Sequence, residues 1–406
     1  MKQSNISEGY KNSPLGIIPN EWKVERLGIS YKIQGGFAFK SELFTNQGIA
    51  IIRISNISVN RDVDLSDCVF YPFTEFVGTP FEVKSGDILI ALSGATTGKS
   101  AMYRLNTIAY LNQRVGLFLQ ISPAINKLFL FYWIDSNTFQ NQLNLLLIAG
   151  AQPNISPKDL ENIKIIIPPL NEQQKIAEVL SIWDKAIEKQ TLLVEKLELR
   201  KKGLMQQLLT GKKRLHGFNG EWKKEKLGKL FDERNETKMQ SLPLLSITAD
   251  KGIISQTASE KKDTSNEDKS KYKRICPGDI GYNTMRMWQG RCALSKLEGI
   301  VSPAYTIVSP HNDVNPFYME MLFKQPFMVY RFWTHSQGLV NDTLNCKYPA
   351  FSQVKVTIPK IEEQNAIAEI LSFCDKEIAL AKQKLDTLRQ QKKGLMQVLL
   401  TGKKRI

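Results

Sequence analysis

The sequence predicts an α+β protein: two mixed α/β domains separated by two long helices that form an antiparallel coiled coil, with a pseudo-two-fold internal repeat. Three observations predict it. One long segment occurs twice, both copies carry apolar residues at heptad spacing, and short β-branched runs precede each copy. The 406 residues suffice for two or three domains. With 42% hydrophobic and 23% charged residues, the composition excludes fibrous and disordered classes.

The repeat begins with IPPLNEQQKIAE at 167–178, which returns as IPKIEEQNAIAE at 358–369. The offset, 358 − 167 = 191 residues, holds without a gap through KKGLMQ and TGKKR near the end of each copy. The motif EWK, at 21–23 and 221–223, opens each half. These anchors predict a first domain at 1–165, a central helix at 166–215, a second domain at 216–357 and a C-terminal helix at 358–406.

Both repeats carry a heptad seam, meaning positions spaced alternately four and three residues apart that are mostly apolar. In the first repeat the seam is Ile176, Leu180, Trp183, Ile187, Gln190, Val194, Leu197, Lys201, Leu204 and Leu208. In the second it is Ile367, Leu371, Cys374, Ile378, Ala381, Leu385, Leu388, Lys392, Leu395 and Leu399. Each helix should run for about 40 residues, or ~60 Å, and a helix this long needs a partner. The alternative is two ordinary amphipathic helices, each covering its own domain.

The domains between these anchors differ in sequence but share one turn pattern. Gly86-Asp87-Ile88 is followed by Gly98, and Gly278-Asp279-Ile280 by Gly290, at the same distance. Short β-branched runs predict strands at 49–54, 87–92 and 304–308, and longer apolar segments predict helices at 129–147 and 317–334. The charged stretch 266–273 is expected to be a loop. The two domains should therefore have one scaffold with different surface side chains.

Several classes of protein are disfavoured. No apolar stretch approaches the ~20 residues that span a bilayer, and no signal peptide is evident, so we expect a cytoplasmic protein. Five cysteines without a CxxC pair and three dispersed histidines argue against disulfide and metal sites. The run SGATTGKS at 93–100 has three residues between its glycines where a P-loop needs four. The net charge of +15 favours a polyanionic partner, with nucleic acid ahead of a membrane surface.

Taken together, these segments resemble the specificity subunit of Type I restriction-modification enzymes over essentially the whole chain. The most specific are the two IP…EQ…IA…L…D signatures at 167–184 and 358–375, each followed by KKGLMQ. IPNEW at 18–22, GFNGEW at 217–222, GAQPNI at 150–155 and GIVSPAY at 299–305 add to the resemblance. It implies two target-recognition domains, each contacting one half of a bipartite, asymmetric double-stranded DNA site.

The resemblance also implies a bacterial defence role and partner subunits. Two modification (methyltransferase) subunits would dock on the helices, which set the spacer between half-sites, and ATP-dependent restriction subunits would join them. S-adenosylmethionine, ATP and Mg²⁺ are then expected on the partners, with no cofactor, metal or catalytic residue in this chain. Alternatives are a specificity subunit for a fused methyltransferase-nuclease, a stand-alone methyltransferase or nuclease, and a coiled-coil scaffold. Co-purification, activity of the purified chain and salt-dependent DNA binding would discriminate among them.

Candidate base-contacting residues are amide, hydroxyl and basic side chains near the predicted turns, because Asn and Gln suit adenine while Arg suits guanine. In the first domain they are Thr97, Lys99, Asn112, Gln113, Arg114, Gln152 and Asn154. In the second they are Arg286, Gln289, Arg291, Ser336, Gln337 and Asn341. Trp288 could stack against DNA, but an aromatic residue beside a turn is more often part of the core. Turns rich in Ser, Thr and Asn are also often plain strand connections.

The positive charge concentrates at the ends of the two predicted helices. Residues 200–214 and 389–405 each hold six Lys or Arg and no acid. Cations suit a helix C-terminus, which explains part of this pattern. We also expect these clusters to meet DNA phosphates or partner subunits.

Overall fold

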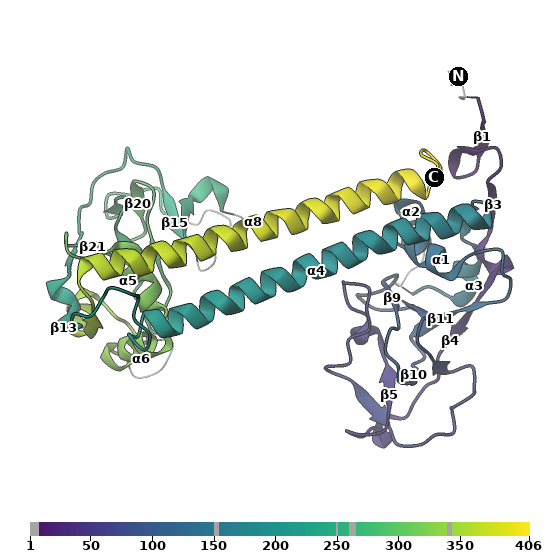
Figure 1. The fold of residues 1–406 in the computed structure, drawn as a ribbon, viewed down its shortest axis with the longest axis horizontal. Helices are drawn as coiled ribbons and strands as arrows, with labels where there is room; N and C mark the ends of the chain where they lie inside the picture. The colour runs from purple at the N-terminus through teal and green to yellow at the C-terminus, as the bar shows by residue number, and fades with distance from the viewer. Residues whose placement is uncertain (1–7, 150–153, 249–250, 260–264, 339–342) are drawn as a thin grey trace. The chain divides into compact units, whose positions relative to one another are not determined.

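The structure is a computed structural model that describes residues 8–149, 154–248, 251–259, 265–338 and 343–406. The chain divides into two compact units, residues 1–190 with 384–406 (unit 1) and residues 191–383 (unit 2). Each long helix contributes one end to each unit (Figure 1). Within the described residues, no helix combines the length and the apolar character needed to cross a membrane.

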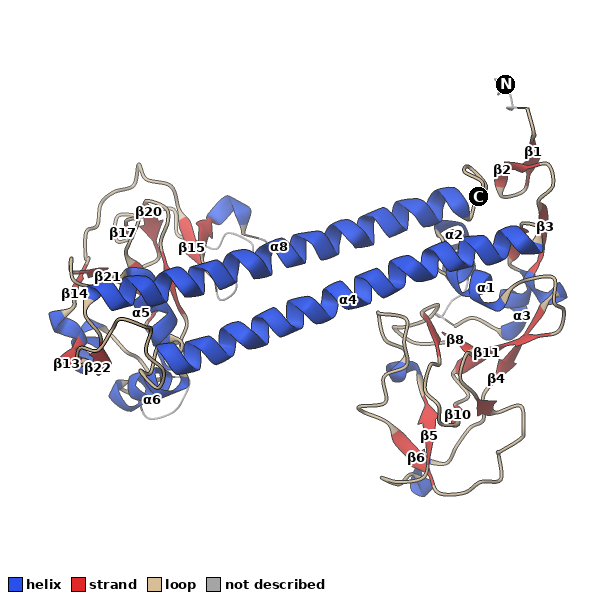
Figure 2. Cartoon of the chain, viewed as in Figure 1, coloured by secondary structure: helices blue, strands red, loops and turns tan. Residues whose placement is uncertain are grey.

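Unit 1 is built on two four-stranded sheets, ordered β4-β11-β8-β9 and β6-β5-β10-β7 (Figure 2). The other two sheets are two-stranded, β1-β2 and β12-β3. Its strands are β1 (Tyr10–Ser13), β2 (Gly16–Pro19), β3 (Lys23–Arg26), β4 (Tyr31–Gly35), β5 (Ile49–Ile52), β6 (Val69–Tyr71), β7 (Glu82–Val83), β8 (Ile88–Ala91), β9 (Ser100–Met102), β10 (Ala109–Leu111), β11 (Val115–Gln120) and β12 (Lys164–Ile167). The strands predicted at 49–54 and 87–92 are confirmed as β5 and β8.

Unit 2 repeats the central sheet of unit 1, because its order β14-β21-β18-β19 matches β4-β11-β8-β9 strand for strand. Strand β13 pairs with β22 as β3 pairs with β12. In each unit, the strand that begins at the lysine of EWK therefore pairs with the strand that precedes a long helix. The strands are β13 (Lys223–Lys226), β14 (Phe231–Glu233), β15 (Leu245–Ile247), β16 (Ile253–Ser255), β17 (Lys273–Ile275), β18 (Ile280–Asn283), β19 (Cys292–Leu294), β20 (Gly299–Val301), β21 (Tyr305–Pro310) and β22 (Lys355–Ile358). The expected common scaffold is confirmed for these two sheets, whereas the four-stranded sheet β6-β5-β10-β7 of unit 1 has no four-stranded counterpart among the described residues of unit 2.

The two segments predicted to be helical inside the domains are confirmed, and each consists of a pair of helices. Unit 1 has α1 (Lys127–Ile134), α2 (Asn137–Ala149) and α3 (Pro157–Asn162). Unit 2 has α5 (Pro316–Phe323), α6 (Pro326–His335) and α7 (Tyr348–Gln353). In unit 1, α1 ends before Ser136 because Ser136 is the N-cap of α2. Its Oγ accepts a hydrogen bond from the Phe139 N–H. Pro326 lies in the first turn of α6, where proline starts a new helix.

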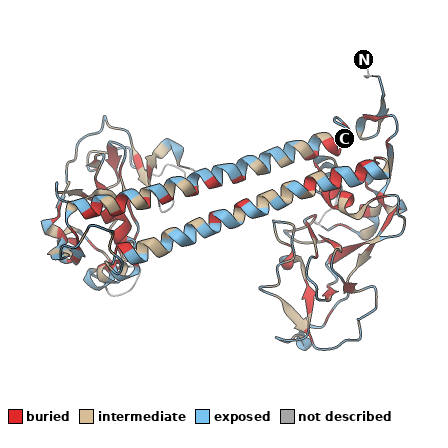
Figure 3. Ribbon diagram, in the orientation of Figure 1, coloured by how far each residue is buried: buried red, intermediate tan, exposed pale blue. Residues whose placement is uncertain are grey.

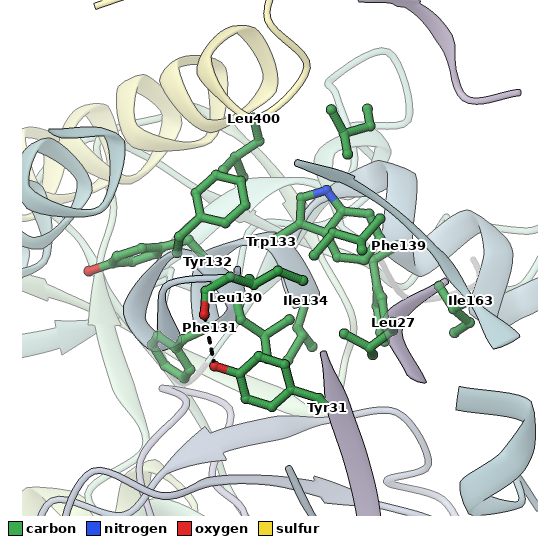
Figure 4. Packing of buried hydrophobic residues seen from close by; sticks show 14 of the residues in the cluster. Leu27, Tyr31, Leu130, Phe131, Tyr132, Trp133, Ile134, Phe139, Ile163 and Leu400 are labelled. Atoms are coloured by element: carbon green, nitrogen blue, oxygen red, sulfur yellow. Dashed lines mark hydrogen bonds between the residues drawn. The ribbon is translucent and has the colours of Figure 1, made fainter. Parts of the chain in front are cut away.

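The largest core lies in unit 1, where α1 is buried on nearly every side. Trp133 packs edge-to-face on Phe139 at 5.5 Å between ring centroids (Figure 4). The hydroxyl of Tyr31 donates to the Ile125 carbonyl at 3.3 Å. The same core takes Leu180 from the start of one long helix and Leu400, just beyond the end of the other. Neither repeat alone therefore completes unit 1.

The long helices α4 (Leu170–Leu208) and α8 (Ile361–Leu399) pair antiparallel within each unit. In unit 1, Asp184 of α4 pairs with Lys392 of α8 at 2.5 Å. In unit 2, Lys201 of α4 pairs with Asp375 of α8 at 2.5 Å, so the two ion pairs are related by the internal repeat. Seam positions are buried or half-buried while the outer faces are exposed (Figure 3). The predicted antiparallel pairing is confirmed, and the alternative of two separate amphipathic helices is wrong.

The first of these ion pairs is also tied to the core of unit 1. The hydroxyl of Tyr132 donates to Asp184 at 2.7 Å, and the Lys392 ammonium lies 5.2 Å from the centroid of the Tyr132 ring. Burial, together with the neighbouring Asp184 carboxylate, raises the pKa of Tyr132. Tyr132 therefore stays protonated as a donor and fixes α1 to the helix pair.

We expect two cysteines of unit 2 to resist thiol reagents in the native protein. Burial raises the pKa of both Cys292 and Cys346 to about 12, so at pH 8 only about one thiol in ten thousand is ionised. Cys68 and Cys276 are half-buried. Titration with a chromogenic disulfide at pH 8 should leave Cys292 and Cys346 unmodified until denaturant is added. Rapid native modification of either residue would contradict their burial.

Candidate nucleic-acid interface

The first candidate loop of unit 1 is the turn between β8 and β9, at 92–99. Gly94 and Gly98 adopt positive φ angles of 81° and 83°, which favour glycine. The Thr97 hydroxyl donates to the Gly94 carbonyl at 2.6 Å, so this side chain shapes the turn. Lys99 is exposed at its end. The loop is therefore a compact turn that presents a cation.

The second candidate segment of unit 1 is the turn between β10 and β11. The Asn112 Oδ1 accepts a long hydrogen bond, 3.4 Å, from the Arg114 N–H, and Asn112 is half-buried. Gln113 and Arg114 are exposed, and their side chains can reach outward. Amide and guanidinium groups at a turn have the donor and acceptor pattern that base edges require.

These segments meet at the end of β8, although they are distant in sequence. The Leu92 N–H donates to the Arg114 carbonyl at 2.9 Å, and the Ile155 N–H donates to the Leu92 carbonyl at 2.9 Å. The second bond brings Asn154, which is exposed, next to the two turns. Gln152 lies outside the described residues. The structure thus brings together Lys99, Gln113, Arg114 and Asn154 around one strand end.

Arg53 also lies beside this strand end, and sequence reasoning missed it. It directly follows β5, and its Nη2 donates to the Asp67 carbonyl at 3.0 Å. The Asn112 N–H donates to the Ile52 carbonyl, and a Cβ on Gly94 would lie 3.2 Å from the Ile54 side chain. Arg53 therefore stands between both candidate turns. A basic residue at the end of an apolar run was the signal that could have identified it.

In unit 2 the equivalent loop, 284–291, leaves the matching strand β18 and contains a short 3₁₀ turn, Met287–Gln289. Met287 is the buried residue of this turn, whereas Gln289 and Arg291 are exposed and Arg286 is half-buried. The Trp288 indole N–H donates to the Met285 carbonyl at 3.0 Å. Trp288 is half-buried, so Met287, and not Trp288, is the anchor of the turn in the core.

The later polar segment of unit 2 divides into structural and exposed positions. The Ser336 hydroxyl donates to the Phe332 carbonyl at 2.7 Å and so completes the end of α6. Gln337 is exposed and forms a two-residue bridge with Asn345, while the Cys346 N–H donates to the Thr284 carbonyl at 2.8 Å. This chain of bonds brings Gln337 toward loop 284–291. Asn341 lies outside the described residues.

The Gly-Asp-Ile motif that precedes each loop supports the scaffold through internal bonds of its aspartate. Asp279 is 2% exposed, and its carboxylate accepts from Arg234 at 2.7 Å and from the Cys276 N–H at 2.7 Å. The Asp279 carboxylate is the main cause of a raised Arg234 pKa. In unit 1, Asp87 accepts from the Lys84 N–H and pairs with Lys127 at 2.9 Å. The motif thus fixes the strand from which each candidate loop departs.

The Glu-Gln pair of each repeat has an internal function that sequence reasoning also missed. Gln173 is 1% exposed, accepts from the Asn126 N–H at 2.8 Å and donates to the Pro168 carbonyl at 2.8 Å. Gln364 makes the same two bonds with Asn315 and Pro359, both at 2.9 Å. Each glutamine therefore fastens the start of a long helix to its own domain. Its presence in both repeats was the available signal.

The neighbouring glutamates bind the basic ends of the opposite helices. Glu172 pairs with Arg405 at 3.1 Å in unit 1, and Glu363 pairs with Arg214 at 2.5 Å in unit 2. Part of the charge expected to meet DNA phosphates or partner subunits is therefore paired inside each unit, at Arg214 and Arg405. Other cations of these clusters are exposed, namely Lys202, Lys212, Lys213, Lys393, Lys403 and Lys404.

Comparison with known proteins identifies the architecture. The model of the Type I restriction modification DNA specificity domain matches residues 19–197 and 219–390. The MjaVIII specificity subunit of Methanocaldococcus jannaschii is 34% identical over 223 residues, 52% of this chain and 51% of that protein. The chain thus spans about half of that relative's length. The putative MjaX specificity subunit of the same organism is 26% identical and aligns over 98% of this chain and 97% of its own length.

Solved structures give the same fold. The Type I S subunit of M. genitalium superposes with a TM-score of 0.56 at 16% identity and covers 93% of this chain and 96% of its own. A chain from a structure describing complex assembly and conformational transition of the Type I system has a TM-score of 0.58 at 17% identity, with 95% and 99% coverage. Because the family model matches both halves separately and together covers most of the sequence, the chain belongs to the Type I restriction-modification DNA specificity family.

Proposed function

We propose that this chain is the sequence-recognition subunit of a Type I restriction-modification complex, and that each unit contacts one half of a bipartite DNA site. One observation carries the proposal. The candidate loops leave the same position of the same sheet, β8–β9 in unit 1 and β18–β19 in unit 2, but present different side chains. Identical scaffolds hold the two loops alike, and their different side chains select different bases. The two half-sites should therefore differ in sequence.

The helix pair provides the surface for the partner subunits. We propose that two modification subunits dock on the helix pair, that the helices set the distance between half-sites, and that restriction subunits join this assembly. The chain itself then acts without a catalytic residue, and S-adenosylmethionine, ATP and Mg²⁺ bind to the partners. Because the DNA on which such a complex acts lies inside the cell, we expect the complex in the cytoplasm. The repeat supports this assignment, since a partner present twice needs two equivalent surfaces.

The proposal predicts separable effects on the two half-sites. Arg291→Ala should relax recognition in one half-site by about 1–3 kcal/mol for each lost base contact, while Arg114→Ala should relax only the other. Both residues are exposed, so neither change should alter folding. Methylated-motif mapping and competition binding of the assembled complex at fixed salt measure the effect. Lys296→Ala, at an exposed residue beyond β19, is the control in unit 2. A loss equal for all sequences would indicate phosphate contact and refute base recognition by that residue.

A further inference from the structure

Two glycines occupy helical positions where nothing in this chain requires them. Gly203 lies inside α4 and its repeat equivalent Gly394 lies inside α8, each five residues before the helix ends. A Cβ added at either position would meet no atom within 4 Å. The glycines that end the helices are different residues, Gly211 and Gly402, with φ angles of 70° and 73°. Glycine weakens a helix interior, so its presence twice at matching positions needs another reason.

In unit 2, Gly203 lies at the same level as an exposed aromatic residue of the neighbouring helix. Lys201 pairs with Asp375 across the seam, and antiparallel pairing then sets Gly203 level with Phe373. Arg200 of α4 also pairs with Glu377 of α8. Phe373 is one turn before Glu377, and Gly203 is about one turn after Arg200, so both lie on the side of the helix pair marked by this ion pair.

Unit 1 has the same arrangement through the repeat. The Asp184–Lys392 ion pair sets Ile182 level with Gly394. Ile182 is 59% exposed and Phe373 is 62% exposed, although both belong to helices whose seam residues are buried. An exposed large apolar side chain thus lies level with a glycine twice, once in each unit.

Two exposed polar residues beside each glycine are the same in both repeats. Lys202 and Gln206 of α4 correspond to Lys393 and Gln397 of α8. Apolar centres with polar surroundings are typical of protein interfaces, and a missing side chain lets a partner approach the helix backbone closely. Because the arrangement occurs once in each unit, one partner bound in two copies fits both.

We propose that Gly203 with Phe373, and Gly394 with Ile182, are the two contact points where the modification subunits approach the helix backbone. This inference rests on the proposed function and assigns residues to its docking surface. Each glycine lowers the stability of its helix but lets the partner approach the backbone. Replacing it should therefore stabilise the isolated chain and weaken the complex.

The test is Gly203→Ala, Gly394→Ala and the double variant, measured as isolated chains and with purified modification subunit. Each single change should raise the melting temperature of the isolated chain, by about 2 °C, because alanine favours the helix. Each should also weaken one of two binding events by about tenfold or more, since a methyl group then overfills a close contact. Native mass spectrometry should show one bound modification subunit for either single variant and none for the double variant. Phe373→Ser should reproduce the loss seen with Gly203→Ala.

Lys196→Ala, another exposed residue of α4 in unit 2, is the control and should leave two subunits bound. Unchanged binding by Gly203→Ala and Phe373→Ser would overturn the contact assignment. Loss of binding together with a lower melting temperature would overturn it as well, because it would give the glycine a structural role. If the wild-type chain binds specific DNA and no modification subunit, the proposed partner is wrong. If it binds neither, the proposed function fails as a whole.

Discussion

Replacing Arg405 with alanine should destabilise unit 1 by about 2–3 kcal/mol, less than for a fully buried ion pair because the Arg405 side chain is partly exposed, although Arg405 lies 233 residues from its partner Glu172. Its guanidinium pairs with Glu172, which is 4% exposed, and with Glu21. The only other group that hydrogen-bonds to the Glu172 carboxylate in the described structure is the Trp22 indole N–H, at 3.0 Å. Without Arg405, the buried carboxylate loses its compensating charge. Urea unfolding followed by tryptophan fluorescence measures the change.

A double variant separates this charge effect from loss of packing. Arg405→Ala combined with Glu172→Gln removes the uncompensated charge, so most of the lost stability should return. Lys404→Ala, at an exposed neighbour, should remain within about 0.5 kcal/mol of the wild type. The equivalent change in unit 2, Arg214→Ala, should act through Glu363, which is 3% exposed. If the double variant is as unstable as Arg405→Ala, the buried charge is not the cause.

Phe351→Ala should destabilise unit 2 by about 3–5 kcal/mol. Its ring is fully buried and touches five other aromatic rings at centroid distances of 5.4–6.2 Å. These rings belong to Phe231, Tyr282, Phe323, Phe332 and Tyr348. Truncation removes both the apolar burial and the aromatic contacts and leaves a cavity between strands and helices.

Near-ultraviolet circular dichroism should report the loss of aromatic packing, and thermal unfolding should report the free energy. Phe373→Ala is the matched control, because that phenylalanine is 62% exposed and its loss should cost little in the isolated chain. Phe351→Leu should fall between the two, since leucine keeps most of the apolar volume. A cost below about 1 kcal/mol for Phe351→Ala would mean that the surrounding rings close over the space.

Long-range periodicity predicted the helix pair because burial of the seam follows directly from heptad spacing. The polar seam positions Gln190, Lys201 and Lys392 did not disturb the prediction, and each lysine pairs with an aspartate of the opposite helix. Inside the domains, apolar content was high throughout 129–147 and 317–334, so it indicated helix but not where one helix ended. The break between the paired helices depends on the capping residue Ser136 in unit 1 and on Pro326 in unit 2. The sequence prediction places Pro326 inside a helix.

The candidate site was predictable only at the level of loops. The glycines located the turn at 93–99 and its counterpart, and the structure joined the first of these to Arg114 and Asn154 through the backbone of Leu92 and Ile155. These segments meet because of the order of the strands in the sheet, and a single sequence does not reveal that order. Thr97 and Ser336 could not be distinguished from base-contacting residues, because hydroxyls that bond to local carbonyls have no separate sequence signature. Base contact by the exposed residues stays a prediction.

The way the helix ends are distributed has a consequence for synthesis on the ribosome. Unit 2 is one continuous segment, 191–383, and can finish folding when that segment has emerged. Unit 1 needs residues 384–406, which follow the whole of unit 2, and until then the Glu172 carboxylate and the surface that receives Leu400 stay uncovered. The half that is translated first is thus completed second. Premature termination in α8 after residue 383 would leave the N-terminal half without its closing contacts, although the contiguous unit 2 is already complete.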